Sequence, residues 1–143
     1  MIDRDGIAAL IPHAGRMCLL DRVEHWDAAS IRCTASSHRD PTNPLAVGGK
    51  LGAACGVEYA AQAMAIHGGL TGAAGKPRAG YLVSLRGLEL TVARLDDLDG
   101  DLIVEAELQA EAGSQVSYRF TVGCGDAIIL SGRASVMLDA GEA

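Results

Sequence analysis

The sequence predicts an α+β domain in which an antiparallel sheet wraps one long apolar helix. Three observations carry this prediction. An Ala-rich stretch at residues 50–67 contains no proline and is apolar on every side except at Glu58 and Gln62, so it has to be enclosed by other elements. Strand-like segments lie on both sides of this stretch. The last third of the chain alternates apolar and polar residues with the period of half-exposed strands.

The composition indicates a single domain without a metal or nucleotide. The length of 143 residues fits one domain over residues 1–143. The four cysteines form neither a CxxC pair nor a zinc-type cluster with histidine. No GxGxxG or GxxxxGK segment occurs. We therefore expect no metal site and no cofactor of the protein's own.

Charge and hydropathy argue against two classes of partner. A net charge of −6 disfavours nucleic acid, because binding to a phosphate backbone depends on clustered Lys and Arg. The longest apolar run, residues 51–66, includes two polar residues and is too short to span a membrane comfortably. Nothing at the start of the chain resembles a signal peptide. Together with the unclustered cysteines, this favours a reducing, cytoplasmic location.

The part of the chain before the helix is expected to form one helical turn and two strands. The second strand is indicated by Ile31, Cys33 and Ala35, which alternate with polar residues. It is followed by a loop rich in proline and glycine, which cannot extend a strand or a helix. The expected ranges are a helical turn at 7–10, strands at 19–26 and 31–37, a turn at 27–30 and the loop at 38–50.

Beyond the helix, the sequence predicts a long strand and then a meander. Gly68 and Gly69 are expected to end the helix, and a Gly/Ala-rich connection follows. The long strand changes its apolar face midway, which predicts a bulge near Gly87. The expected ranges are the connection at 70–79, the long strand at 81–95, and meander strands at 104–111, 116–122 and 127–138, with turns at Gly113 and Gly125.

Glu58 is the first candidate for chemistry. It lies among apolar residues, so its ionised form would lose hydration, and we expect a raised pKa. A carboxylic acid of this kind can deliver a proton as a general acid. The alternative is a buried pair with a backbone group or a lysine. Gln62, one turn further along the helix, either orients this carboxyl group or fills a gap at the helix surface.

His38 is the second candidate. It ends a predicted strand and begins the loop at 38–50, a place where a rigid scaffold presents a side chain at a cleft. A neutral imidazole in this position can act as a base. Because His38 lies in a polar run, the alternative is an ordinary solvated histidine. His13, His25 and His67 are weaker candidates.

Two motifs resemble the 3-hydroxyacyl-carrier-protein dehydratases of the FabA/FabZ type, and most closely the branch of aryl-polyene and polyketide gene clusters. The segment Ile11–Val23 is similar to the opening segment of that family, and Glu58–Gln62 is similar to its helix motif. His38, followed by Asn43 and Pro44, resembles the family's catalytic loop. Residues 39–41 depart from the loop pattern of the family. The resemblance covers most of the chain and implies the hotdog fold.

The resemblance also implies roles for individual residues. His38 would remove a proton from C2 of a 3-hydroxyacyl thioester, and Glu58 would protonate the departing hydroxyl group, across the interface of a dimer. A backbone N–H at the start of the helix would stabilise the thioester oxygen. The substrate would be a carrier-protein or CoA thioester. The residues expected to contact it are Gln62, Gly52 or Gly56, and Pro44, with Arg78 and Arg86 facing an acidic carrier protein.

Two other functions stay open. A thioesterase of the same fold can use a helix carboxylate such as Glu58 without any need for His38. A non-catalytic subunit would retain the fold while another hotdog chain supplies the chemistry, and the altered residues 39–41 favour this option. The expected assembly is accordingly a homodimer or a heterodimer with a second hotdog subunit.

Overall fold

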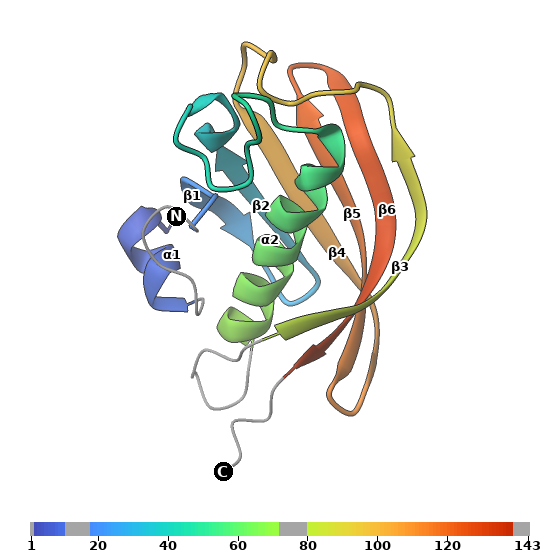
Figure 1. The fold of residues 1–143 in the computed structure, drawn as a ribbon. Coiled ribbons are helices and arrows are strands. Elements are labelled where there is room, and N and C mark those ends of the chain that lie inside the picture. Colours follow the sequence, from blue (N-terminus) through green and yellow to red (C-terminus); the bar gives the residue numbers. More distant parts are fainter. Residues whose placement is uncertain (1, 11–17, 72–79, 139–143) are drawn as a thin grey trace.

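Six antiparallel strands curve around one long helix in this computed structural model, which describes residues 2–10, 18–71 and 80–138 (Figure 1). No helix among these residues is both long and apolar enough to cross a membrane. In chain order the elements are α1 (Arg4–Leu10), β1 (Arg22–Trp26), β2 (Ser30–Ala35), η2 (Ser37–Arg39), η3 (Ala53–Cys55), α2 (Gly56–Thr71), β3 (Gly80–Leu90), β4 (Leu102–Ala112), β5 (Gln115–Cys124) and β6 (Ala127–Leu138).

The strand order is β1-β2-β4-β5-β6-β3. β4, β5 and β6 are antiparallel neighbours, which confirms the predicted meander. Gly113 and Gly125 form its two turns with φ of +64° and +61°, a left-handed conformation that suits glycine. β3 follows α2 in the chain and pairs with β6 at one edge of the sheet. β1 forms the opposite edge, so the meander lies between segments that come earlier in the chain.

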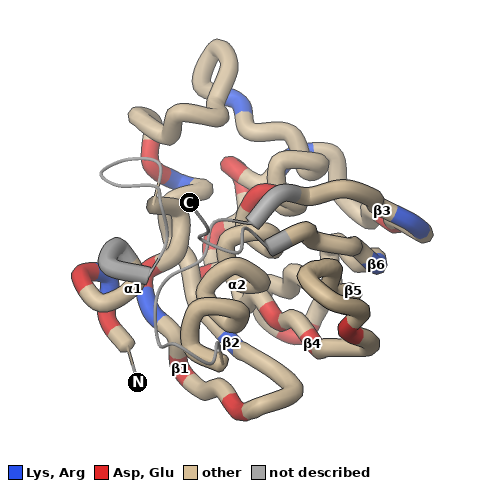
Figure 2. Tube along the Cα trace, turned by 90° about the horizontal axis from the view of Figure 1, so that it is seen from below, with Lys and Arg blue, Asp and Glu red and all other residues tan. Residues whose placement is uncertain are grey.

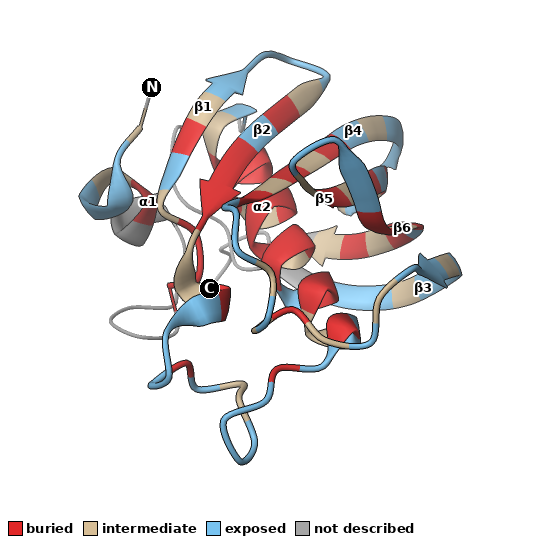
Figure 3. Cartoon of the chain, turned by 90° about the horizontal axis from the view of Figure 1, so that it is seen from above, coloured by how far each residue is buried: buried red, intermediate tan, exposed pale blue. Residues whose placement is uncertain are grey.

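The core lies between α2 and the concave face of the sheet, where the burial colours of Figure 3 show α2 mostly enclosed. The enclosure predicted from the apolar circumference of the helix is confirmed for most of that circumference, and one face of the helix stays uncovered in the single chain. The start of α2 lies close to β6, since a Cβ on Gly56 would lie 3.4 Å from Cδ1 of Leu130. The largest fully buried side chains include Leu19, Ile31, Tyr59, Met64, Ile66, Leu102, Phe120 and Leu130.

The far end of α2 is fixed by a buried histidine. His67 Nδ1 lies 2.7 Å from the Tyr118 hydroxyl of β5, and its Nε2 lies 2.8 Å from the carbonyl oxygen of Asp27 in the β1–β2 turn. Asp27 in turn accepts the backbone N–H of Ser30 through its side chain. His67 therefore joins the helix to two parts of the sheet, which is a structural role.

The predicted end of the helix was wrong. α2 continues through Gly68 and Gly69 to Thr71, and the Thr71 hydroxyl donates to the carbonyl of His67 at 2.8 Å. Both glycines are buried, so packing against the enclosing elements outweighs their weak intrinsic preference for helix. The helix also begins later than expected, because Ala53–Cys55 forms a 3-10 turn.

The predicted strands are present, but some of them begin or end at other residues than expected. β1 begins at Arg22 and not at Leu19, whose backbone N–H donates to the side chain of Gln62. β2 ends at Ala35, before the 3-10 turn that holds His38. The bulge near Gly87 is confirmed by a register shift between Arg86 and Glu89. Most of the connection at 70–79 lies outside the described residues.

Candidate active site

His38 is buried at one end of the sheet, on the 3-10 turn Ser37–Arg39, with 1% of its surface exposed. Its Nε2 lies 3.2 Å from the carbonyl oxygen of Leu98. A carbonyl only accepts, so Nε2 carries the proton in this contact and Nδ1 of the neutral ring keeps its lone pair. Among the described residues, this Nδ1 is the one buried side-chain nitrogen or oxygen without a hydrogen-bond partner. His38 thus holds a free basic nitrogen.

The surroundings keep this imidazole neutral. Burial lowers the pKa of His38 below its ordinary value of 6.5, and the positive charge of Arg39 lowers it further. The carbonyls of Leu98 and Gly100 and the charge of Asp101 act in the opposite direction and do not outweigh burial. Near pH 7 the ring is therefore in the form that can accept a proton.

Glu58 lies in the first turn of α2 and is exposed in the single chain. The expectation that it is buried among apolar residues was wrong for the chain by itself. Its position explains the difference: Glu58 lies on the helix face with Ala54, Ala61 and Ala65, which are all exposed or half-buried. This uncovered face of the helix, here called the alanine stripe, leaves the carboxylate open on the side that other elements of the chain do not reach.

Gln62 joins the helix to the segment before β1. Its Oε1 accepts the backbone N–H of Leu19 at 2.9 Å, in a buried environment. That oxygen is therefore engaged with the opening segment.

A buried hydrogen-bond network, here called the Tyr59 network, connects the turn of His38 to the start of α2. The Ser37 hydroxyl donates to the carbonyl of Leu19 at 2.7 Å and therefore accepts from the Tyr59 hydroxyl, 2.8 Å away. Asn43 Nδ2 donates both to the Tyr59 hydroxyl at 3.0 Å and to the carbonyl of Ser37 at 2.9 Å. Tyr59 is completely buried.

The Tyr59 network places the two candidates relative to each other, since Ser37 precedes His38 and Tyr59 follows Glu58 in the chain. Sequence reasoning missed it. The available signal was a tyrosine, with its one polar atom, inside an otherwise apolar helix, because a buried tyrosine hydroxyl needs a partner.

The other predicted binding residues are spread over the molecule. Gly52 is exposed just before η3. The N–H of Gly56 already donates to the carbonyl of Ala53 at the start of the helix, so within the single chain this N–H is not free for a thioester oxygen. Pro44 is exposed and lines a polar hollow of about 120 Å³ together with Asp21 and Asn43.

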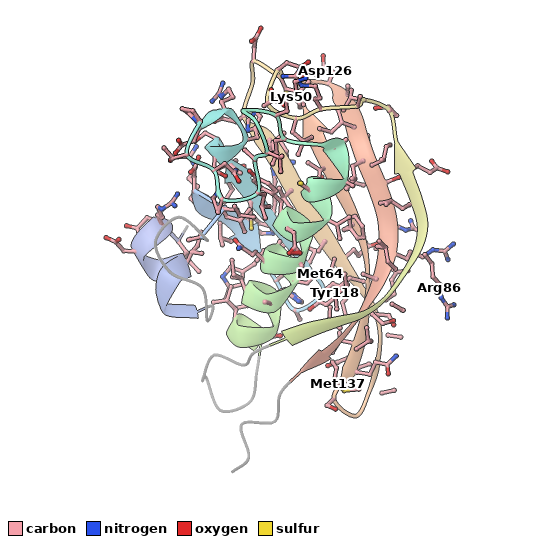
Figure 4. The ribbon with its side chains drawn as sticks, in the orientation of Figure 1. Lys50, Met64, Arg86, Tyr118, Asp126 and Met137 are labelled. Atoms are coloured by element: carbon pink, nitrogen blue, oxygen red, sulfur yellow. The ribbon has the colours of Figure 1, made fainter. Side chains whose placement is uncertain are left out.

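Of the two arginines that were predicted to face a carrier protein, the structure describes one. Arg86 lies on β3 and points away from α2 (Figure 4). The structure therefore places it on the other side of the sheet from Glu58 and does not bring the two together. Arg78 lies outside the described residues.

The curved sheet around a single long helix, with a buried histidine connected to the helix start, defines a hotdog-fold protein. A family model described as ApeP dehydratase matches residues 6–142. The chain belongs to this ApeP-like family of dehydratases. The resemblance to dehydratases and the hotdog fold, both predicted from the sequence, are thereby confirmed.

Solved structures agree on the fold. The dehydratase heterocomplex ApeI:P from Xenorhabdus doucetiae contains a chain of 20% identity, with a TM-score of 0.83 over 94% of this chain and 91% of that one. A mutant thioesterase from Pseudomonas aeruginosa matches with 13% identity and a TM-score of 0.62, over 82% and 80%. A thioesterase from Haemophilus influenzae matches with 11% identity and a TM-score of 0.62, over 85% and 80%. A comparison with curated protein sequences found no significant match.

Proposed function

We propose that this dehydratase converts a 3-hydroxyacyl thioester, bound to a carrier protein or CoA, into a trans-2-enoyl thioester. The observation that carries the proposal is the unpartnered Nδ1 of the buried His38. This nitrogen takes the proton from C2 of the substrate. The electron pair forms the C2–C3 double bond, the C3–O bond breaks, and Glu58 donates a proton to the departing hydroxyl group, which leaves as water. Membership in a dehydratase family supports this assignment.

The exposed position of Glu58 supports a site that is completed by a second hotdog subunit. The alanine stripe leaves its carboxylate in contact with solvent, whereas the catalytic groups of an enzyme act most effectively where water is excluded. The edge strand β3 exposes three leucines on the face of the sheet toward α2, because they pair with the buried residues Val136, Ala134 and Leu130 of β6. The three are Leu82, Leu85 and Leu90, at 40%, 39% and 45% exposure.

A partner subunit that pairs with β3 and lies on the alanine stripe covers both features, and its apolar surface removes water from Glu58. The partner is either a second copy or a different hotdog chain. The name of the Xenorhabdus complex describes two components, which supports the second form. A thioesterase function is the alternative, favoured by the fold of the two thioesterases above. A cytoplasmic location stays a prediction.

The test uses the purified chain, alone and mixed with a second hotdog subunit of a dehydratase. The substrate is a 3-hydroxyacyl-pantetheine thioester, and the enoyl absorbance and the release of free thiol are followed in the same sample. Enoyl formation in either condition supports the dehydratase, and the condition that shows it defines the assembly. Rapid thiol release without enoyl formation would identify a thioesterase.

Tyr59→Phe is expected to lower kcat of dehydration by about tenfold or more with a smaller change in KM, because small misplacements of catalytic groups cost up to about 100-fold. The substitution removes the hydroxyl that joins Ser37 to Asn43. Tyr118→Phe is the matched control, since it removes a buried hydroxyl bonded to His67 at the other end of α2. Equal losses of kcat in both variants would reduce the Tyr59 network to a purely structural role.

The pH dependence of kcat/KM is expected to show an acid limb below pH 6.5, because burial and Arg39 lower the pKa of His38 from 6.5 and protonation removes the base. Arg39→Gln removes a positive charge that disfavours the imidazolium. It also frees the carboxylate of Asp101, which Arg39 contacts at 2.8 Å. Both effects raise the pKa of His38, so the limb moves to higher pH. Arg32→Gln is the control, because Arg32 lies on a strand away from His38, and this variant is expected to leave the acid limb at its wild-type pH. A limb that stays unchanged in Arg39→Gln would contradict the role of His38.

A further inference from the structure

The connection between β3 and β4, residues 91–101, holds the segment that leads into α2. Leu95 donates its backbone N–H to the carbonyl of Leu51 at 2.8 Å, and Ala53 donates to the carbonyl of Ala93 at 3.0 Å. Both leucines are completely buried. Backbone pairing and burial therefore fix the chain directly before the helix begins.

The side chain of Asp96 adds a contact to this pairing. Its Oδ1 accepts the backbone N–H of Leu51 at 2.8 Å and Nε of Arg94 at 3.1 Å, and only 16% of the side chain is exposed. Arg94 and the N–H of Leu51 hold the pKa of Asp96 well below its ordinary range, so this side chain stays a carboxylate near neutral pH. An ionised carboxylate is a strong acceptor for a backbone N–H. Leu51 is thus bound through its N–H as well as through its carbonyl.

The position of Leu51 matters because an exposed loop ends there. Asn43 and Leu51 are buried, whereas none of the residues 44–50 between them is buried. At the tip of this loop, Gly48 and Gly49 have φ of +61° and +77°, a left-handed conformation that suits glycine. The loop itself therefore contributes little to the core. The contacts at its two ends determine how the turn of His38 is connected to the start of α2.

Asp96 lies between the contacts that hold the two candidate residues of the active site. The carbonyl of Leu98 accepts Nε2 of His38 at 3.2 Å, and the N–H of Leu98 donates to the carbonyl of Leu95 at 3.1 Å. The strands form an arc around α2 from β1 to β3 (Figure 2), and they leave the helix face of Glu58 uncovered in the single chain. The β3–β4 connection is accordingly a second link between the two candidates, besides the Tyr59 network.

We propose that Asp96 is a positioning residue, which holds Leu51 and thereby places the start of α2, with Glu58, where the reaction at His38 requires it. This inference rests on the proposed function, because it assigns Asp96 a role in the same site. Asp96 acts on the reaction only through the backbone at Leu51. Without its carboxylate, the end of the exposed loop loses one of its two anchors, and the carboxyl group of Glu58 moves relative to the base.

The test compares Asp96→Ala with Asp97→Ala, in the subunit assembly in which the wild type forms the enoyl product. Asp97 is the matched control, because it is an exposed aspartate in the same connection. Asp96→Ala is expected to lower kcat about tenfold to 100-fold, the cost of a small misplacement of catalytic groups. KM is expected to change by less than about twofold, since the substrate contacts themselves remain. Asp97→Ala is expected to behave like wild type.

Two conservative variants separate positioning from a general structural role. Asp96→Asn keeps an oxygen that can accept the N–H of Leu51, and it is expected to keep kcat within about threefold of wild type, because an ion pair with a half-exposed arginine contributes little. Arg94→Gln leaves the carboxylate in place and is expected to have an equally small effect. An unchanged kcat in Asp96→Ala, or equal losses in Asp96→Ala and in either Asp96→Asn or Asp97→Ala, would overturn the inference.

Hydrogen exchange of the backbone amides gives a readout that does not depend on activity. In Asp96→Ala, faster exchange is expected at residues 51–58, with unchanged exchange in β5. If the wild type forms no enoyl product under any condition, the proposed function is overturned, and this local change would still support the placement of the helix start by Asp96. Unchanged exchange at residues 51–58, or faster exchange throughout the sheet, would overturn the inference and leave the proposed function untouched.

Discussion

His38→Ala is expected to lower kcat/KM for dehydration by about 10² to 10⁴-fold, the range that one general acid or base contributes. The substitution removes the one buried and unpartnered basic nitrogen of the described residues. The measurement is enoyl absorbance with a 3-hydroxyacyl-pantetheine thioester, in whichever subunit assembly the wild type is active. His38→Gln keeps polar atoms in the turn, and we expect the same loss, because an amide is no base at neutral pH.

His25→Ala is the control for this result. His25 lies on β1 and its side chain is 69% exposed, so its removal is expected to leave the rate unchanged. A His38→Ala protein that is folded and still dehydrates the substrate at the wild-type rate would exclude the acid and base pair. If that protein also released thiol from acyl-CoA, the thioesterase alternative would take its place, since a hydrolase that uses Glu58 alone does not need His38.

Glu58→Gln is expected to lower kcat by a similar factor of about 10² to 10⁴, because the amide has the shape of the carboxyl group and no proton to give. The exposed position of Glu58 predicts little change in thermal stability, so loss of activity will not reflect unfolding. Glu24→Gln is a suitable control, since Glu24 lies on β1 and forms surface ion pairs with Arg22 and Arg32 of β1 and β2.

Mixing the two inactive variants tests whether the site is shared between subunits. If His38 of one copy acts with Glu58 of the other, dimers that contain one His38→Ala and one Glu58→Gln chain hold one intact site. Random exchange of subunits then restores about one quarter of the wild-type activity, by the symmetry of a two-fold dimer. No recovery after demonstrated exchange would place both residues in the same subunit, or assign one of the two roles to a different hotdog chain.

The fold was predictable because its signals are local. The alternation of Val104, Ala106 and Leu108 with glutamates and Gln109 specifies one buried face, and β4 forms there. The change of parity around Gly87 predicted a bulge that the structure contains. The apolar circumference of the helix predicted that other elements would enclose it. In each case a period of two or 3.6 residues, or a glycine at a turn, determines the outcome without reference to distant residues.

The environment of the site was less predictable, because it depends on which distant residues meet. Glu58 has apolar neighbours along the chain, but the exposure of a helical residue depends on the helix face on which it lies. Glu58 shares its face with Ala54, Ala61 and Ala65, and this face is not covered in the single chain. The burial of His38 depends on the carbonyl of Leu98, 60 residues away. Gly68 and Gly69 remain helical because of tertiary packing, which cannot be predicted from local helix propensity.

The irregular course of β3 has a consequence for how this protein avoids indiscriminate association. An exposed edge strand with apolar side chains is a template on which any extended chain can add, and sheets that grow in this way aggregate. β3 interrupts its ladder twice, between Leu82 and Ser84 and between Arg86 and Glu89. A regular strand cannot keep its hydrogen-bond register along an edge with two bulges. Only an edge strand with bulges at matching positions can pair with β3. The same two bulges therefore act as a filter that admits a related subunit and rejects an unfolded or foreign chain.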